Sequence, residues 1–316
     1  MEATRSLTGS RTRFFAAVEE LATVGDMVRF GASALNEAGC WFGHGNDNAL
    51  DEAHLLVLHA VHLRETFLEE ASLPGELYAA RVVSEEKRAI GELLWRRINE
   101  RIPAAYLIGE ATFAGLPFYV DGRVLVPRSP LAEVIERAFD ALVPKPPERV
   151  LDIGTGSGCI AVACAYALPQ AELVAADIDE GARAVAVRNV ARHGLASRIE
   201  VVAADVFRGI DGVFDLVISN PPYVAPVIVD ALPLEYRHEP RIGLDAGGDG
   251  LDIVRRMLSE GVSYLTPDGV MIVEVGEARP ALEVAFPELA LLWLDDELER
   301  GGEGVFMIHA SDLPLQ

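Results

Sequence analysis

From Pro146 onward the chain alternates between short apolar runs and longer amphipathic segments. The runs are rich in β-branched residues and bounded by Gly, Pro or Asp, as buried strands are, and the longer segments have helical periodicity. This alternation predicts a mostly parallel sheet with helices on both faces. The expected strands are Arg149–Ile153, Leu173–Asp177, Ile199–Ala203, Leu216–Ser219, Val270–Val275 and, later, Leu289–Leu294 and Val305–His309; the expected helices are Gly158–Leu168, Asp179–His193 and Leu251–Leu265.

Residues 1–104 predict a separate, small helical domain. His54–Leu63 is apolar on nearly every face, and Glu85–Arg101 carries apolar residues at helical spacing with charges between them. In residues 105–127 the Asp121-Gly122 turn separates two β-like runs, Pro117–Val120 and Arg123–Val126, which predicts a β-hairpin linker. The remaining residues, 128–316, form the expected α/β domain, whose first helix begins with Ser129 as cap and Pro130 at the first helical position.

Composition excludes several classes of protein. Half of the residues are hydrophobic and the mean hydropathy is +0.22, which is enough for a substantial core, but the longest apolar run, Ile160–Leu168, is too short to cross a bilayer. Met1–Arg13 lacks the apolar region of a secretory signal. Cys40, Cys159 and Cys164 lie in apolar contexts and read as buried thiols. These features predict a cytoplasmic protein.

The net charge of −22 bears on possible partners. A nonspecific nucleic-acid binder needs a basic patch to neutralise phosphates, so we expect no direct nucleic-acid binding and no membrane partner. An acidic surface suits a basic protein partner and a cationic cofactor. The acidity is also explained by solubility alone.

The first strand of the α/β region runs into a glycine-rich loop. Asp152 and Ile153 are followed by Gly154-Thr155-Gly156-Ser157-Gly158, where glycines allow a tight turn and close approach of a ligand to a helix amino terminus. The third glycine comes one residue too early for the dinucleotide fingerprint, and Cys159 stands in its place. A purely structural turn is the competing interpretation.

Two acids at the ends of the next strands strengthen the case for a nucleoside cofactor. Asp177 is placed to accept hydrogen bonds from both ribose hydroxyls, and Asp205 to hold an adenine amino group, with Val206 or Phe207 covering the ring. Either acid alone also fits a helix cap. Because ligands of such sheets bind at the carboxyl ends of strands, the sequence predicts a nucleoside site there.

The run Phe214–Ser219 ends at Asn220-Pro221-Pro222-Tyr223. Two consecutive prolines cannot donate ladder hydrogen bonds, so the strand must stop and a stiff turn must follow. The turn offers an amide oxygen, a proline carbonyl and an aromatic face. This combination predicts a socket for a planar –NH2 group beside the cofactor loop.

These motifs resemble known families. Asp152–Gly158 is similar to the D-x-G-x-G-x-G loop of S-adenosylmethionine-dependent methyltransferases, and Asn-Pro-Pro-Tyr to the motif of amino-methyltransferases, which modify exocyclic nitrogens of adenine, guanine or glutamine. Arg101–Glu110, followed by Phe113, Gly115 and Phe118, resembles the linker of protein N5-glutamine methyltransferases. The segments Glu235–Pro240 and Gly247–Asp252 agree with that family. The resemblance runs from about Arg101 to the carboxyl end and implies a Rossmann-like class I methyltransferase with a seven-stranded sheet.

Arg123–Pro130 resembles the branch of the family that modifies the third protein of the large ribosomal subunit. The sister branch, which acts on peptide chain release factors, has an acidic residue soon after Pro-Arg-Pro, where this chain has Ser129-Pro130-Leu131. The implied reaction transfers a methyl group from S-adenosylmethionine to a glutamine amide and leaves S-adenosylhomocysteine. Release-factor methylation, DNA or rRNA methylation on an exocyclic amine and a non-catalytic role in ribosome assembly are the alternatives.

The resemblance also implies roles for individual residues. Asn220 and the Pro221 carbonyl would accept the two N–H bonds of the substrate amide, and Tyr223 would stack on its plane. No strong general base is needed, because the methylated nitrogen is acidic enough to lose its proton to water. The implied catalytic residues are Asn220, Pro221 and Tyr223; the substrate-binding residues are these and Pro222; the cofactor-binding residues are Asp152, Gly154, Thr155, Gly156, Ser157, Gly158, Asp177, Asp205, Val206 and Asn220.

Several other residues that could suggest a metal or substrate site have simpler structural explanations. The spacing of His54, His59 and His62 matches no zinc motif, and Asp245–Arg256 fails the calcium-loop pattern at its third and twelfth positions, so no metal is expected. Glu274 and Glu277, on either side of Gly276, either face the site or are solvated acids at a strand end, which is the commoner case. Arg128 either meets the substrate or holds the junction between the domains.

Overall fold

The computed structural model describes residues 8–63, 74–139, 142–143, 145–295, 298 and 304–314. The chain divides into two compact units. The helical unit consists of Met1–Gly109 together with Pro233–His238, and the sheet unit of Glu110–Leu232 and Glu239–Gln316. The chain therefore leaves the sheet unit once, for a six-residue segment that belongs to the helical unit.

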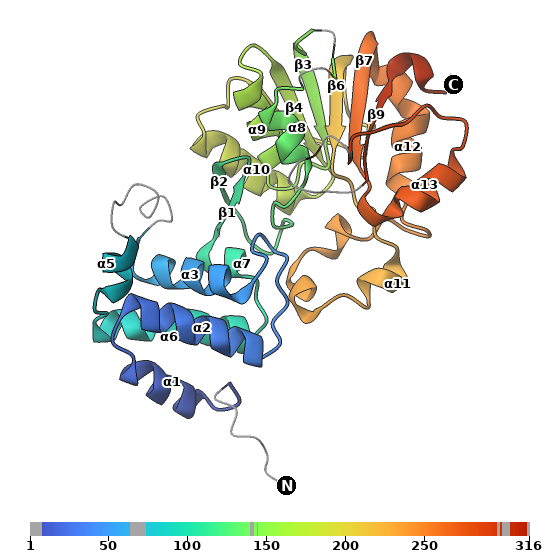
Figure 1. The fold of residues 1–316 in the computed structure, drawn as a ribbon. Helices are drawn as coiled ribbons and strands as arrows, with labels where there is room; N and C mark the ends of the chain where they lie inside the picture. Colours follow the sequence, from blue (N-terminus) through green and yellow to red (C-terminus); the bar gives the residue numbers. More distant parts are fainter. Residues whose placement is uncertain are drawn as a thin grey trace. The chain divides into compact units, whose positions relative to one another are not determined.

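The helical unit packs its amphipathic helices around one apolar core (Figure 1). Phe14, Met27, Leu56 and Leu94, from different helices, are fully buried there. The two predicted helices are present with shifted ends, because the Asn48 side chain caps the first and Asn99 ends the second, before Arg101 with its positive φ of 60°. The elements are α1 (Arg11–Glu20), α2 (Val24–Glu37), α3 (Ala49–Ala60), α5 (Pro74–Ala79), α6 (Ser84–Asn99), α7 (Ala104–Ile108) and the 3-10 helix η1 (Leu234–His238).

A buried ion cluster fastens η1 within this unit. Arg97, fully buried on α6, donates to Glu52 Oε1 at 2.6 Å, to Glu235 Oε1 at 3.0 Å and to the Trp41 carbonyl at 2.6 Å. Glu235 also accepts the Trp41 N–H at 3.0 Å, and burial raises the pKa of Glu52 although Arg97 opposes the shift. Arg101 Nη1 lies 3.4 Å from Glu235 Oε1. Buried charges of this kind require mutual pairing.

The sheet unit contains a seven-stranded sheet in the order β5-β4-β3-β6-β7-β9-β8. All neighbours are parallel except β9, which pairs antiparallel with β7 and β8. The predicted mostly parallel sheet is therefore confirmed. Its strands are β3 (Arg149–Ile153), β4 (Glu172–Asp177), β5 (Ile199–Ala203), β6 (Phe214–Ser219), β7 (Leu265–Glu274), β8 (Leu292–Trp293) and β9 (Val305–His309).

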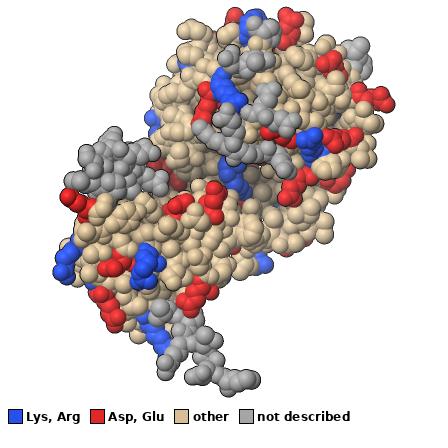
Figure 2. Space-filling view, in the orientation of Figure 1, with Lys and Arg blue, Asp and Glu red and all other residues tan. Residues whose placement is uncertain are grey.

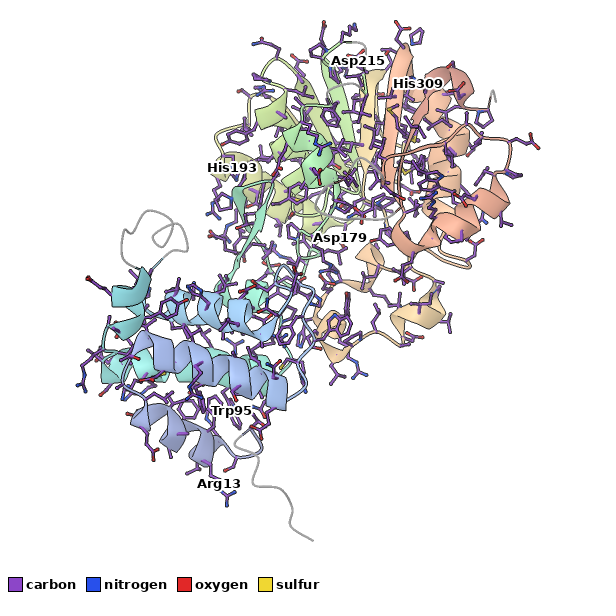
Figure 3. The ribbon with its side chains drawn as sticks, viewed as in Figure 1. Arg13, Trp95, Asp179, His193, Asp215 and His309 are labelled. Carbon is purple, nitrogen blue, oxygen red and sulfur yellow. The ribbon has the colours of Figure 1, made fainter. Side chains whose placement is uncertain are left out.

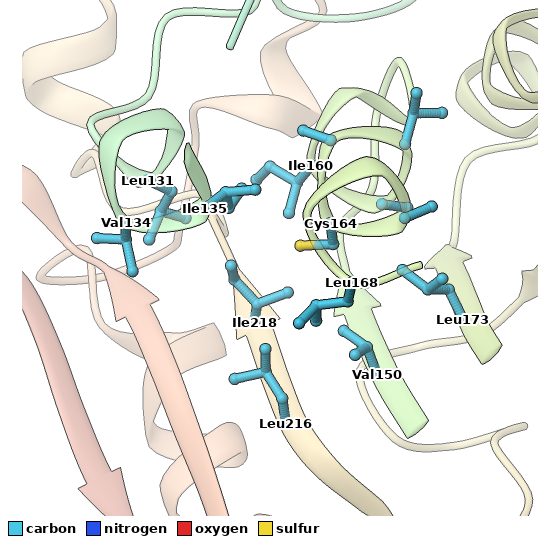
Figure 4. Close-up of a cluster of buried hydrophobic side chains, with 14 of the residues drawn as sticks. Leu131, Val134, Ile135, Val150, Ile160, Cys164, Leu168, Leu173, Leu216 and Ile218 are labelled. Atoms are coloured by element: carbon cyan, nitrogen blue, oxygen red, sulfur yellow. The ribbon is translucent and has the colours of Figure 1, made fainter. Parts of the chain in front are cut away.

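Alternate residues of the strands pack into different cores. Val150 and Leu216 face the core made with α8 (Leu131–Glu136), α9 (Cys159–Ala167) and α10 (Glu180–Arg192), part of which is drawn in Figure 4. Leu151 and Val217 face the core that contains residues of α12 (Asp252–Glu260) and α13 (Arg279–Ala285). The two faces of the sheet are covered as expected (Figure 1). The short helix α11 (Pro226–Val229) and the 3-10 helices η2 (Arg241–Gly243), η3 (Gly261–Tyr264), η4 (Gly276–Ala278) and η6 (Ala310–Asp312) complete the unit.

The predicted hairpin strands are wrong in position. The hairpin pairs β1 (Glu110–Phe113) with β2 (Leu116–Tyr119) around Ala114 and Gly115, both with positive φ, and Arg123–Val126 forms no strand. Asp121 instead makes a local turn, accepting hydrogen bonds from the Arg123 N–H and the Tyr119 hydroxyl. Helix α8 begins at Leu131, one residue later than predicted, and the Ser129 hydroxyl accepts its N–H at 3.1 Å.

Among the helices of the described residues, none is long and apolar enough to cross a membrane.

Candidate active site

The predicted site residues lie at the carboxyl edge of the sheet, on neighbouring strands. In register, Ile153 of β3 pairs with Ser219 of β6 on one side and with Ala176 of β4 on the other. The Ser219 hydroxyl donates to the Ile153 carbonyl at 2.7 Å, which fixes the start of the glycine loop against the start of the Asn-Pro-Pro-Tyr turn. Asp179, just after β4, marks this edge in Figure 3, whereas Asp215 and His309 mark the opposite one. The loop and the turn therefore begin side by side.

Backbone hydrogen bonds to strand β4 hold the glycine loop. Gly154, Gly156 and Gly158 have φ values of 69°, 54° and 80°, a region that strongly favours glycine. The N–H groups of Gly154 and Thr155 donate to the Ala176 carbonyl at 2.8 and 3.0 Å. A Cβ at Gly154 would meet nothing within 4 Å, and this residue is exposed, so the loop presents bare backbone outward in front of α9.

Asp152 lies beneath the loop rather than on its surface. One of its oxygens, Oδ2, accepts from the Thr155 hydroxyl at 2.6 Å and from the Ala161 N–H at 3.1 Å, and Oδ1 is buried without a partner in the described residues. Burial raises its pKa to about 7. Thr155 and Ser157 are buried too, so their side chains shape the loop from within.

Asp177 ends β4 with both oxygens engaged by backbone. Oδ2 accepts the Gly156 N–H and Oδ1 the Asp179 N–H, each at 2.9 Å, and burial raises the carboxyl pKa. The next residue, Ile178, is an isoleucine with 57% exposure. Ile178 was not among the predicted cofactor-binding residues. Its sequence position, an apolar residue directly after the predicted ribose-binding Asp177, could have indicated it.

Asp205 follows β5 and is partly exposed. Arg256 of α12 donates to its Oδ1 at 2.6 Å and to its carbonyl at 3.0 Å, which lowers the carboxyl pKa. Val206 has a φ of 55° and is buried. Phe207 is fully buried and stacks on Tyr264 at 4.5 Å between ring centroids. Both residues expected to cover an adenine ring are buried, but Phe207 already stacks on Tyr264, so Val206 remains the candidate.

The Asn220–Tyr223 turn combines open acceptors with a fixed aromatic ring. Asn220 is half-buried and Pro221 buried, and within the described part of the chain no group hydrogen-bonds the Asn220 carboxamide or the Pro221 carbonyl. Val224 then exchanges backbone hydrogen bonds with the Leu244–Ala246 segment, at 3.0 Å in both directions. The turn thus keeps acceptors available while its exit is anchored.

The interpretation of Glu274 as a solvated acid is wrong. Glu274, the last residue of β7, is 4% exposed and accepts the Tyr223 hydroxyl at Oε1 (2.9 Å) and the Ser129 hydroxyl at Oε2. Burial raises its pKa to about 7. Its partners are distant in sequence, so no local signal revealed the contact; Glu277, by contrast, is exposed.

The other candidate residues have structural partners. Arg128 donates from both terminal nitrogens to the two oxygens of buried Glu239, each at 2.6 Å, inside the sheet unit. His54 Nδ1 lies 3.2 Å from the Tyr78 hydroxyl. Across the described ranges there is no group of three or more His, Cys, Asp or Glu residues that could hold a metal ion.

Comparison with known proteins shows that the chain is a methyltransferase whose methyl donor is S-adenosylmethionine. Residues 132–232 match the family described as methyltransferase small domain. The observed features fit this cofactor: exposed loop backbone for its amino-acid part, Asp177 for ribose hydroxyls, and exposed Ile178 for an apolar ring face.

Close relatives narrow the class. The chain is 44% identical over 280 residues to the ribosomal protein uL3 glutamine methyltransferase of Bordetella pertussis, an alignment that covers 88% of this chain and 92% of that protein. It is 44% identical over 301 residues to the enzyme of the same name from Xanthomonas campestris pv. campestris, covering 94% of each. The corresponding protein of Xylella fastidiosa is also 44% identical, with coverage of 94% and 93%. The chain belongs to the family of ribosomal protein uL3 glutamine methyltransferases.

Proposed function

We propose that this protein transfers a methyl group from S-adenosylmethionine to the side-chain amide nitrogen of a glutamine in ribosomal protein uL3. The observation that carries the proposal is the Asn220–Tyr223 turn, with two unengaged acceptors beside the glycine loop, in a chain that is 44% identical to proteins named for this reaction. The cofactor supplies an electrophilic methyl group on a sulfonium.

The socket overcomes the low nucleophilicity of an amide nitrogen, whose lone pair is delocalised into its carbonyl. Asn220 Oδ1 and the Pro221 carbonyl accept the two amide N–H bonds, while Tyr223 stacks on the amide plane. Pro222 stiffens the turn, so the acceptors keep their directions. The nitrogen is thereby aimed at the methyl group from about 3–3.5 Å, and fixed acceptors need no reorganisation during the reaction.

The cofactor is held by groups on three neighbouring strand ends. The backbone of Gly154–Gly158 approaches the amino-acid part, with Asp152 supporting the loop from below. Asp177 accepts from the ribose hydroxyls, Ile178 and Val206 pack against the adenine, and Asp205 receives its amino group on the oxygen that Arg256 does not occupy. Asn220 borders both cofactor and substrate.

Domain roles follow from the same proposal. Residues 1–104 recognise the folded substrate, residues 105–127 connect this region to the catalytic region, and residues 128–316 bind the cofactor and catalyse methyl transfer. The net charge of −22 favours a basic ribosomal protein as the substrate. In the face drawn in Figure 2, Lys and Arg of the described residues stand singly or in small groups among Asp and Glu, which does not favour nucleic acid as the substrate.

The test is a methyl-transfer assay with radiolabelled S-adenosylmethionine. Purified uL3, a peptide chain release factor, rRNA and DNA are offered separately, and peptide mapping locates the modified residue. We expect label on one glutamine of uL3. Asn220→Ala should reduce turnover by at least about 10²-fold while calorimetric cofactor binding survives. Label on release factor or nucleic acid alone, or near-normal turnover by N220A, would refute the assignment.

A further inference from the structure

The buried carboxyl of Glu274 is a feature that the proposed reaction leaves unused. It ends strand β7, which lies between β6 and β9 in the sheet, and its two oxygens accept from different hydroxyls: Tyr223 on Oε1 at 2.9 Å and Ser129 on Oε2. Ser129 also caps the start of α8 through the Leu131 N–H. Burying a carboxyl costs stability unless it is well hydrogen-bonded, so a structural role alone would be served better by an apolar residue.

Tyr223 is constrained at its hydroxyl, at one edge of its ring and at its backbone. Glu274 holds its hydroxyl, and a Cβ added at Gly276 would lie only 2.9 Å from ring atom Cε2, so Gly276 lies directly against the ring. A Cβ at Gly250 would lie 2.6 Å from the Tyr223 carbonyl. The ring is thus limited on its Gly276 side, and its hydroxyl is held by Glu274.

We propose that Glu274 is a positioning residue for methyl transfer, which fixes the plane of the Tyr223 ring by accepting its hydroxyl hydrogen bond and thereby orients the substrate amide. The inference rests on the proposed function of the Asn220–Tyr223 turn. Since small misplacements of a reacting group cost up to about 10²-fold in rate, the effect should fall on kcat.

The hydrogen bonds of Glu274 allow a positioning role to be distinguished from a role as proton acceptor. The groups that act on the Glu274 carboxyl are the Tyr223 and Ser129 hydroxyls, which hydrogen-bond to it, and the charged Arg128 guanidinium. All three oppose the effect of burial, which raises the pKa of Glu274 to about 7. When protonated, Glu274 can donate to Ser129 and still accept from Tyr223. Gln at this position can do the same through its amide. Positioning therefore predicts that kcat does not change through pH 7 and that Glu274→Gln is active, whereas a proton acceptor would lose activity in both cases.

The experiment measures kcat, KM and S-adenosylmethionine affinity for wild type, E274A, E274Q, Y223F and E274A/Y223F, with uL3 as substrate. The matched control is E277A, three residues further on and exposed. We expect E274A and Y223F each to lower kcat by about 10- to 100-fold. Their S-adenosylmethionine affinity should stay unchanged, and this unchanged affinity also shows that the variants fold. The double variant should be no slower than Y223F, and E274Q and E277A should stay within about threefold of wild type.

Three results would overturn the positioning role: multiplicative effects of E274A and Y223F, E274A within about threefold of wild type, or E274Q as inactive as E274A. Failure of the wild-type protein to methylate uL3 would instead refute the proposed function. The two failures are therefore distinguishable.

Discussion

Replacing Arg97 should destabilise the helical unit far more than replacing its neighbour Arg96. Arg97 is fully buried and its guanidinium pairs with Glu52 and Glu235, so Arg97→Met would leave the Glu52 carboxylate buried without its cation and Glu235 with only the 3.4 Å contact to Arg101. Removing one member of a buried ion network costs about 3–5 kcal/mol. Arg96 makes an exposed i,i+4 pair with Glu100, and such pairs contribute at most about 0.5 kcal/mol.

The tryptophans allow this effect to be read from the helical unit alone. The chain has three, and Trp293 is the one in the sheet unit, so in a W293F background fluorescence reports Trp41 and Trp95. With a urea m-value of about 2 kcal/mol/M, R97M should lower the unfolding midpoint by roughly 2 M and R96M by less than about 0.3 M.

A second variant tests the physical cause. If the cost arises from uncompensated buried charge, R97M/E52Q should recover at least about 1 kcal/mol relative to R97M, because it removes one carboxylate. Equal midpoints for R97M and R96M, or no recovery in R97M/E52Q, would refute the reasoning.

Two other predictions concern pH and salt. Folding raises the pKa of Glu274 from 4.5 to about 7, so the wild-type protein loses stability as the pH rises through this interval, whereas E274Q does not. The Tm of E274Q minus the Tm of wild type, measured in thermal melts, should therefore increase between pH 5 and pH 8. A constant difference would contradict the buried carboxyl. If a protein of net charge −22 meets a basic substrate by electrostatic steering, kcat/KM should fall between 50 and 300 mM salt while kcat at saturation holds, and a flat profile would remove that role for the charge.

The strand ends were predictable because backbone chemistry dictates them. The glycines after Ile153 favour a turn and the prolines after Asn220 cannot donate ladder hydrogen bonds, and β3, β5 and β9 have their predicted bounds. The hairpin was misplaced because Asp121-Gly122 is a strong turn signal that here serves a local turn. Val126 donates its N–H to the Glu239 carboxylate at 3.0 Å instead of to a strand, and that acceptor lies more than a hundred positions away in sequence.

Buried charge was the main feature that the sequence did not reveal. Glu274 follows Val273 in an apolar run, and the ordinary preference of carboxyls for water argued for exposure. Its burial depends on hydroxyls from Ser129 and Tyr223, and that of Glu235 on Arg97, all brought together only by the tertiary fold. Local patterns carry no information on such long-range pairs.

The excursion of Pro233–His238 into the helical unit limits how this protein can be dissected. A fragment ending at Gly109 would lack Glu235 and leave Arg97 with a single carboxylate. A chimera meant to exchange substrate preference between relatives must therefore exchange two separate stretches of sequence together: the amino-terminal helices and this hexapeptide.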